Sequence, residues 1–429
     1  MAFVISPKLA AIFIIVLPVL AVLIVVIMRR AFPQFRTLQE KLDALNSCIQ
    51  EGLVGIRLIK SFVRGDYEEM RFEKRNQQLK EANLTAMKTM LLYTPLMTLA
   101  LNITTVVVVW AGGNMIVAGN MQVGDLTAFT NYIVQIMSSL TMLSIAFLNW
   151  ARAIVSFRRV GEVLDEKIDL TDENAKHKDR AVCEGSVEFQ NVSFRYYKNS
   201  PEWVIENISF KLEAGKTLGI IGSTGSGKST LVSMIPRLYD TDEGTVLVDG
   251  INVRDYGLKP LREGIGMVLQ NNTLFSGSIT ENLKWGDEHA DEKAVRKAAQ
   301  NAQAAGFIDS FKDGYRTRLE QSGNNVSGGQ KQRLCIARAL LKCPKILILD
   351  DSTSAVDTAT ERAIREALHS EYKDMTKIII AQRIRSVMDA DEILVLDNGK
   401  TAGFGTHEQL LADCPVYREI YDVQNGREE

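Results

Sequence analysis

The sequence predicts a helical membrane domain followed by an α/β domain with a mainly parallel core sheet. Two observations lead to this prediction. The first half of the chain contains three long segments that are almost free of charge, whereas in the second half short β-type runs alternate with helical segments. The 429 residues carry a formal net charge of −2 and no long basic tract, so nucleic acid is not expected as a partner. The five cysteines are an odd number without C-x-x-C spacing, which indicates a reduced compartment without disulfides or a metal cage.

Three segments are long and apolar enough to cross a membrane. Residues 9–28 are 20 residues without a charge, which can span a hydrocarbon core of roughly 30 Å as a helix. Residues 89–151 contain no Lys or Arg and a single acid, Asp125, so we expect further spans at about 90–117 and 126–147. Basic residues gather at the ends of the spans away from the short turn between the second and third, and the positive-inside rule makes those ends cytoplasmic.

The segment between the first two spans is polar but keeps the three- and four-residue spacing of a helix. If residues 8–60 form one helix, with a possible kink at Pro33, it is on the order of 80 Å long. Only about 30 Å of this length can lie in lipid. We therefore expect a cytoplasmic stalk that breaks near Gly65 and returns to the membrane; the alternative is an ordinary coiled-coil hairpin.

Three spans that end in the cytoplasm place Met1 on the outer side, with few residues before the first span. We therefore expect an odd number of further spans upstream of this sequence. The predicted organisation is a partial membrane domain over residues 1–165, a charged linker over residues 166–184 and an α/β domain over residues 185–425.

A glycine-rich motif predicts a nucleotide site in the α/β domain. The pattern G-x-x-x-x-G-K-[ST] follows a β-type run and precedes a helical segment, which is the context that a phosphate-binding loop requires. Its backbone N–H groups surround the phosphates, Lys228 reaches the β- and γ-phosphates, and the Ser229 hydroxyl coordinates Mg²⁺. The predicted nucleotide-binding residues of this loop are Gly222, Ser223, Thr224, Gly225, Ser226, Gly227, Lys228, Ser229 and Thr230.

Two further features complete the predicted chemistry. The apolar run ILILD ends at Asp350, where a carboxylate can hold the magnesium ion. Far from the loop, Ser327, Gly328 and Gly329 begin a helical segment and offer backbone donors for a second anion. One nucleotide cannot easily use both sites within one domain, so we expect each chain to lend its second site to a nucleotide held by another chain.

The order of these motifs resembles the nucleotide-binding domain of an ABC transporter, and the stalked spans resemble the exporter branch of that family. The resemblance covers essentially the whole chain. It implies a half-transporter that binds ATP and Mg²⁺, hydrolyses ATP to drive export of a substrate, and dimerises with a second half-transporter in the lipid bilayer. It places the nucleotide-binding domain in the cytoplasm. It also matches residues 6–18 to the start of the fourth of six spans, so that three spans are expected upstream.

The resemblance also implies roles for single residues. Tyr196 resembles the aromatic residue that stacks on adenine, and Gln270 resembles the glutamine that touches Mg²⁺ and signals to the membrane domain. Asp357 resembles part of the loop that crosses the dimer, and the break near Gly65 resembles a coupling helix. The signature motif is matched, with Val326 in place of the usual leucine, by Ser327, Gly328, Gly329 and Gln330.

Two positions depart from the family pattern at the site of hydrolysis. Asp351 stands where the family usually has the glutamate that works on the attacking water, and its side chain is shorter by one C–C bond, roughly 1.5 Å. Gln382 stands where the family has a histidine, and an amide can neither carry the imidazolium charge nor relay a proton. The segment TRLEQSGNN before the signature also departs from the family pattern.

Both departures lie at the γ-phosphate, whereas the phosphate loop, Gln270 and the signature are intact. This pattern predicts a degenerate site that binds ATP and hydrolyses it slowly, in a heterodimer whose other site combines the partner's phosphate loop with this chain's signature. The alternatives are a regulatory subunit that gates a partner without hydrolysis, a homodimeric slow ATPase exporter, and an inert fragment. The exported substrate is not indicated: Asn131, Gln135 and Ser138 share one helix face and suit either a polar substrate path or interhelical hydrogen bonds.

Overall fold

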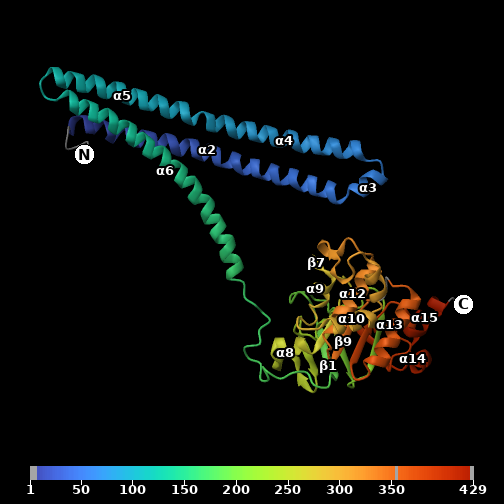
Figure 1. Cartoon of the computed structure of the whole chain (residues 1–429). Helices are drawn as coiled ribbons and strands as arrows, with labels where there is room; N and C mark the ends of the chain where they lie inside the picture. The colour runs from blue at the N-terminus through green and yellow to red at the C-terminus, as the bar shows by residue number, and fades with distance from the viewer. Residues whose placement is uncertain (1–6, 353–355, 426–429) are drawn as a thin grey trace. The chain divides into compact units, whose positions relative to one another are not determined.

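The computed structural model describes residues 7–352 and 356–425 (Figure 1). Within this range, several side chains between residues 137 and 155 and that of residue 8 are not described. The chain divides into two compact units, residues 1–166 and 167–429, which are considered one at a time below. The predicted position of Met1 outside the membrane lies outside the described residues.

The first unit is entirely helical over its described part. The three segments predicted to be spans are helical, and two stretches, Leu9–Val54 and Gly65–Val117, are long and apolar enough to cross a membrane. The expected single helix over residues 8–60 is instead interrupted at Gly55, and the expected break near Gly65 follows Ser61. The helices are α2 (Pro7–Val54), α3 (Ile56–Ser61), α4 (Gly65–Leu91), α5 (Tyr93–Val117) and α6 (Val123–Leu164).

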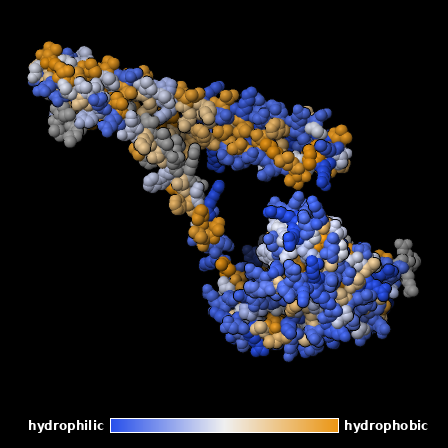
Figure 2. All heavy atoms as spheres, viewed as in Figure 1, coloured by the Kyte–Doolittle hydropathy of each residue, from blue (hydrophilic) through white to orange (hydrophobic). Residues whose placement is uncertain are grey.

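Helix packing in this unit leaves most apolar side chains outside. Leu9, Val108 and Phe129 join α2, α5 and α6 in one buried cluster, and the rings of Phe13 and Phe129 stack with their centroids 6.1 Å apart. By contrast Ile15 and Trp110 are 70% and 72% exposed, and apolar side chains cover much of the helical unit while the second unit is mainly hydrophilic (Figure 2). An apolar surface of this extent is stable in lipid and not in water.

Beyond the apolar part, α2 and α4 run side by side as a polar pair (Figure 1). Arg71 Nη2 of α4 lies 2.5 Å from Glu51 Oε2 of α2, and the hydrogen bond and charge of Glu51 raise the pKa of Arg71. Lys41 Nζ donates to Gln78 Oε1 at 3.5 Å. The Arg71–Glu51 ion pair is largely exposed, so it contributes little to the stability of the helix pair.

The second unit contains two main sheets. The larger has the order β12-β11-β3-β10-β9-β6 and is parallel except for the edge strand β12, as the α/β prediction requires. The β-type runs at 186–194 and 244–250 belong to a separate antiparallel sheet of order β2-β1-β4-β5. The strands of the larger sheet are β3 (Thr217–Gly222), β6 (Ile265–Val268), β9 (Ile346–Asp350), β10 (Thr376–Ile380), β11 (Glu392–Asp397) and β12 (Lys400–Gly405).

The remaining elements surround these strands. The second sheet consists of β1 (Val187–Phe194), β2 (Ile205–Leu212), β4 (Glu243–Val248) and β5 (Ile251–Asn252), and β7 (Gly277–Ser278) pairs with β8 (Arg318–Leu319). The helices are α7 (Lys228–Ser233), α8 (Leu258–Glu263), α9 (Ile279–Leu283), α10 (Glu292–Asn301), α11 (Ala305–Ser310), α12 (Gly328–Leu341), α13 (Thr358–Glu371), α14 (His407–Asp413) and α15 (Pro415–Asn425), with short 3-10 turns between them.

The end of the predicted linker is held against the second unit by one carboxylate. Asp249 Oδ2 accepts hydrogen bonds from the backbone N–H groups of Cys183 and Glu184 at 2.7 and 3.1 Å. Its Oδ1 accepts from Gly185 and Ser186 at 2.7 and 3.0 Å. Four donors converge on one charged group, so this side chain fixes how the chain enters β1.

Replacing Asp249 with Ala removes all four hydrogen bonds and puts a Cβ without polar atoms at φ 50°, a left-handed conformation that Asp and Asn tolerate best. We expect a loss of about 2 kcal/mol in the unfolding free energy of this unit, and thus a Tm lower by roughly 4–8 °C. Asp249→Asn is the matched control, because it keeps one acceptor oxygen. Equal melting temperatures for the two variants would show that the hydrogen bonds contribute nothing.

Candidate nucleotide-binding site

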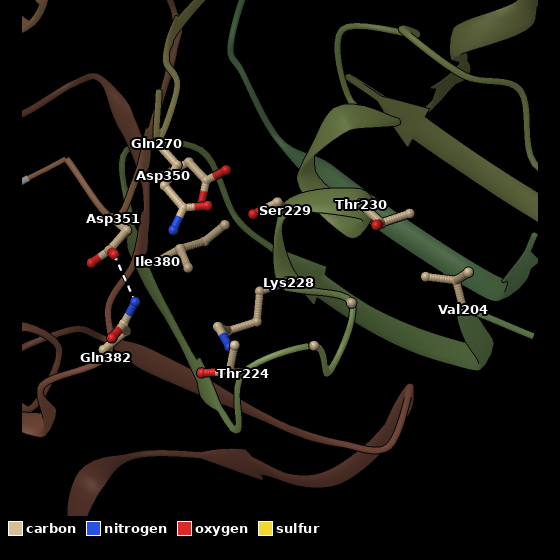
Figure 3. A pocket seen from close by; sticks show the side chains of 12 residues that line it. Val204, Thr224, Lys228, Ser229, Thr230, Gln270, Asp350, Asp351, Ile380 and Gln382 are labelled. Atoms are coloured by element: carbon tan, nitrogen blue, oxygen red, sulfur yellow. Dashed lines mark hydrogen bonds between the residues drawn. The ribbon is translucent and has the colours of Figure 1, made fainter. Parts of the chain in front are cut away.

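A cavity of about 200 Å³ in the second unit brings together five separate stretches of the sequence (Figure 3). Most of its side chains lie at or just beyond the carboxyl ends of β3, β6, β9 and β10, which meet at one edge of the parallel sheet. The lining residues are Val204, Thr224, Gly225, Gly227, Lys228, Ser229, Thr230, Gln270, Asp350, Asp351, Ile380 and Gln382.

The turn that follows β3 requires glycine at two positions. Gly222 has φ 157°, and a Cβ there would lie 2.1 Å from the carbonyl oxygen of Leu396. Gly227 has φ 89°, and a Cβ there would lie 2.6 Å from Cγ2 of Ile205. A side chain at either position would displace the neighbouring strand, so the loop holds its curled shape only with these glycines.

The ammonium group of Lys228 folds back over this loop. Its Nζ donates to the carbonyl oxygens of Gly222 and Ser223 at 2.9 and 2.7 Å. Burial lowers the pKa of Lys228, and the charges of Asp350 and Asp351 oppose this shift. The lysine is thus placed between the loop and two carboxylates, where a polyphosphate would exchange carbonyl contacts for charged ones.

The residues predicted to hold magnesium form a set of oxygen donors in this cavity. Ser229, Gln270 and Asp350 all line it, and the Ser229 hydroxyl is turned toward Asp350 (Figure 3). Burial raises the pKa of Asp350, while a hydrogen bond from Ser229 and the charge of Lys228 lower it. A hydroxyl, an amide and a carboxylate suit Mg²⁺, which takes few protein ligands and completes its shell with phosphate oxygens and water. Within residues 7–352 and 356–425 there is no cluster of three or more His, Cys, Asp or Glu side chains that could hold a metal ion.

The two departures predicted to weaken hydrolysis contact each other. Gln382 Nε2 donates a hydrogen bond to Asp351 Oδ2 at 2.8 Å (Figure 3). Burial raises the pKa of Asp351 and the charge of Asp350 raises it further, whereas the bond from Gln382 and the charges of Lys228 and Arg383 lower it. The carboxylate that would act on water is therefore engaged by the amide at the position of the family's histidine.

The Asp351–Gln382 pair is held in place by residues that no sequence pattern marked. Gln424 of α15 brackets the Gln382 loop: its Nε2 donates to the Gln382 carbonyl oxygen and its Oε1 accepts from the Ile384 N–H, both at 2.8 Å. The backbone oxygen of Asp351 accepts from Gln332 Nε2 of the signature helix at 3.3 Å. No local pattern marks Gln424, because 42 residues separate it from the loop that it holds. Val204 and Ile380 are apolar lining residues without a motif of their own.

Four predicted nucleotide ligands lie beside the cavity and not on its lining. Gly222, Ser223 and Ser226 belong to the phosphate loop, and they hold Lys228 through its Nζ contacts. Tyr196 is half-exposed. Its hydroxyl and Thr230 Oγ1 share a hydrogen bond of 2.9 Å, and its ring packs edge-on against Tyr239. The stacking of Tyr196 on adenine stays a prediction.

The signature residues lie apart from this cavity. Ser327 caps α12: its Oγ accepts from the Gln330 N–H at 3.3 Å, and Gln330 Oε1 accepts from the Ser327 N–H at 2.9 Å. Ser327 and Gly328 are exposed, and among the described residues that line the cavity none belongs to 327–330. Asp357 likewise caps α13 by accepting from the Thr360 N–H at 3.0 Å; residues 353–355 of its loop lie outside the described residues.

Comparisons with known proteins identify the family. A family model of the ABC transporter transmembrane region matches residues 1–140, and the ABC transporter model matches residues 205–354. The chain is 41% identical over 424 residues to the uncharacterized ABC transporter ATP-binding protein YfiB of Bacillus subtilis (strain 168), covering 99% of this chain and 73% of that protein. The chain belongs to the ABC transporter family. It is a membrane-embedded exporter half-transporter whose ATP-binding domain lies in the cytoplasm, and this confirms the predicted fold class, family and location.

A second relative and a solved structure support the same family assignment. The uncharacterized ABC transporter ATP-binding protein Rv1273c of Mycobacterium tuberculosis (strain ATCC 25618 / H37Rv) is 40% identical over 412 residues, covering 95% of this chain and 70% of that protein. A solved structure of a bacterial Atm1-family ABC exporter with ATP bound superposes with a TM-score of 0.87 at 28% identity, covering 97% of this chain and 73% of that one. The expected upstream spans stay a prediction.

Asp350→Asn keeps the shape of the side chain but removes the charge that would hold Mg²⁺. In the unchanged protein, Mg²⁺ should tighten ATP binding relative to binding in EDTA; in the variant this gain should fall roughly tenfold. The measurement is the Kd of a fluorescent ATP analogue with Mg²⁺ and with EDTA. Asp413→Asn serves as the control, since Asp413 is exposed at the end of α14 and is not among the cavity's lining residues. An undiminished gain in Asp350→Asn would exclude Asp350 as a ligand.

Gln424→Ala removes both hydrogen bonds to the Gln382 loop. Gln382 lines the nucleotide cavity, and the family resemblance predicts that it contacts the γ-phosphate. On that prediction we expect the Kd for ATP to rise roughly tenfold while the Kd for ADP stays the same. Asn425→Ala is the neighbouring control, since Asn425 accepts from Arg385 and does not touch Gln382. If ATP and ADP weaken equally in Gln424→Ala, the glutamine supports the fold and not the γ-phosphate contact.

Proposed function

We propose that this half-transporter is the degenerate-site subunit of a heterodimeric ABC exporter. Its own site, built on Lys228 and Asp350, binds MgATP and hydrolyses it slowly. Its signature residues complete the partner's site, where most of the hydrolysis takes place. The observation that carries this proposal is the 2.8 Å hydrogen bond from Gln382 to Asp351, because it joins both departures from the family pattern in one contact.

The two departures would weaken hydrolysis in two ways. Asp351 is shorter than glutamate by one C–C bond, roughly 1.5 Å, and a misplacement of about 1 Å can lower a rate on the order of 100-fold. One carboxylate oxygen also accepts from Gln382 and is therefore less free to orient or deprotonate a water molecule. The amide of Gln382 can still donate to a γ-phosphate, so binding is affected less than turnover.

The rest of the machinery supports retained function and not decay. The phosphate loop keeps the glycines that its geometry requires, and the oxygen donors for Mg²⁺ line one cavity. The signature segment is capped and exposed, away from the nucleotide cavity of its own domain, as is needed for use by another subunit. A subunit that only gates its partner would not need an ordered signature, so this arrangement favours catalysis at the shared site.

Restoring both side chains tests the proposal. The double variant Asp351→Glu with Gln382→His should raise ATP turnover at this chain's own site by roughly 100-fold. Turnover is measured with the partner's phosphate-loop lysine replaced, so that only this site can hydrolyse. Each single variant should give a smaller gain, since either one leaves half of the defect in place. No gain in the double variant, with ATP binding unchanged, would contradict a degenerate site.

The subunit composition is tested separately by native mass analysis of the complete protein extracted from its own membranes. A 1:1 complex with a second, similar subunit is the expected result. A complex made only of copies of this chain would replace the heterodimer by a homodimeric exporter in which both sites carry Asp351 and Gln382.

A further inference from the structure

A second cavity, of about 1100 Å³, lies within the same unit and shares no lining residue with the nucleotide cavity. Its floor is a face of the parallel sheet that presents Thr217, Lys377 and Ile379. Helix α13 forms one wall, the segment 384–390 forms another, and α15 contributes Tyr421. Lys377 is the second residue of β10 and pairs with Thr217, the first residue of β3. The cavity thus starts at the amino ends of the strands whose carboxyl ends line the nucleotide cavity.

The floor of this cavity contains a lysine whose ammonium group faces the open cavity. Lys377 as a whole residue is 5% exposed, its Nζ is not among the fully buried polar atoms, and it makes no hydrogen bond or ion pair with any described residue. Burial lowers the pKa of Lys377; Asp391 and Asp374 oppose the shift from beyond ion-pair distance. Asp391 is already engaged, since its Oδ2 accepts from the Thr217 N–H at 2.7 Å. A partly desolvated ammonium without a counter-ion is stabilised when an anion binds beside it.

The acids of the cavity are neutralised by arginines of its walls. Glu366 Oε1 lies 2.9 Å from Arg362 Nε, and Asp389 Oδ2 lies 3.5 Å from Arg365 Nη1. These pairs leave no negative charge on the lining for Lys377.

Arg385 adds a second cation without a counter-charge. Its Nη2 donates to the neutral Asn425 Oδ1 at 3.3 Å, and over residues 7–352 and 356–425 it forms no ion pair with a carboxylate. The charged side chains of the lining are thus four cations and two acids, an excess of two positive charges: Arg362, Arg365, Lys377 and Arg385 against Glu366 and Asp389. Apolar side chains share the same space, including Ile379 of the floor and Met388 of the wall.

We propose that this cavity is a binding site for a small organic anion, whose anionic group is held by Arg385 while Lys377 adds its positive charge from the floor. The apolar body of the ligand lies against Ile379, Met388 and Tyr421. The volume exceeds what a lone inorganic ion needs and lies just above the range for small-molecule sites, about 300–1,000 Å³.

Pyridoxal 5′-phosphate is a suitable probe, because it joins a phosphate and an aldehyde on one apolar ring. The phosphate binds Arg385, and the neutral ε-amine of Lys377 attacks the aldehyde carbon. The carbinolamine then loses water to give an imine. Borohydride delivers a hydride to the imine carbon and solvent supplies a proton to the nitrogen, which leaves a stable secondary amine. Peptide mass mapping of the full chain in phosphatidylcholine nanodiscs then gives a labelling rate for each lysine.

The matched reagent is pyridoxal, which has the same ring and aldehyde without the phosphate. Lys377 should be labelled roughly tenfold faster by the phosphorylated probe, with saturation, while the exposed Lys198 shows no such preference. Arg385→Gln should remove the preference at Lys377 without changing the rate with pyridoxal. Saturating MgATP should protect Lys228 and leave Lys377 unprotected, which separates this site from the nucleotide site.

Protection of Lys228 by MgATP in each variant also shows that the domain is folded. With that control satisfied, three results would each overturn the proposal: no label on Lys377, equal rates with the two reagents, or a preference that survives Arg385→Gln. Protection of Lys377 by MgATP in parallel with Lys228 would likewise overturn it, since the cavity would then be an extension of nucleotide binding.

Discussion

The nucleotide site depends on one constraint, the parallel register of β3, β10 and β9. Ile380 of β10 pairs with Ile220 on one side and with Asp350 on the other, so the three strands end at nearly the same level. Whatever follows each strand is therefore brought to a common edge. The phosphate loop, the acid pair and Gln382 come from positions far apart in the chain, and only this register places them around one cavity.

Within that frame, the end of β9 fixes how far the carboxylate of Asp351 can reach. Asp351 has φ 47°, and its N–H donates to the Ile380 carbonyl oxygen at 3.0 Å, so its backbone position is set by β10. A side chain one carbon short cannot recover its reach by moving that backbone. In this position the Asp351 carboxylate accepts a hydrogen bond from the amide of Gln382. The phosphate loop and the Asp351–Gln382 pair come from different strand ends, so substitutions can alter one without changing the sequence of the other.

The loop that carries Gln382 lies at the nucleotide end of the sheet, and the chain that follows it reaches the second cavity at the opposite end. One side of it is held by Gln424 of α15, and the segment that continues from it forms a wall of the second cavity. Lys377 and Gln382 lie at opposite ends of β10, only five residues apart in the chain. The structure therefore connects α15, the second cavity and the γ-phosphate side of the nucleotide site through one short segment.

Several features of the protein follow from the sequence alone, because each depends on neighbouring residues. The apolar segments mark the spans, the glycines and Lys228 mark the phosphate loop, and Asp350 marks the end of a buried strand. Asp351 and Gln382 could be singled out as departures since a family pattern exists to depart from. The division of the strands into two sheets could not be predicted, because the composition of the runs at 186–194 and 244–250 does not indicate which strands they pair with.

Only the tertiary structure decided which distant residues meet. The contact between Asp351 and Gln382, the two hydrogen bonds of Gln424 and the isolation of Lys377 each join or separate groups from different elements. Such relations are set by strand register and helix packing, and a local pattern carries no information about either. The sequence determined which side chains the nucleotide-binding domain contains. The register of three parallel strands decided which of them line one cavity.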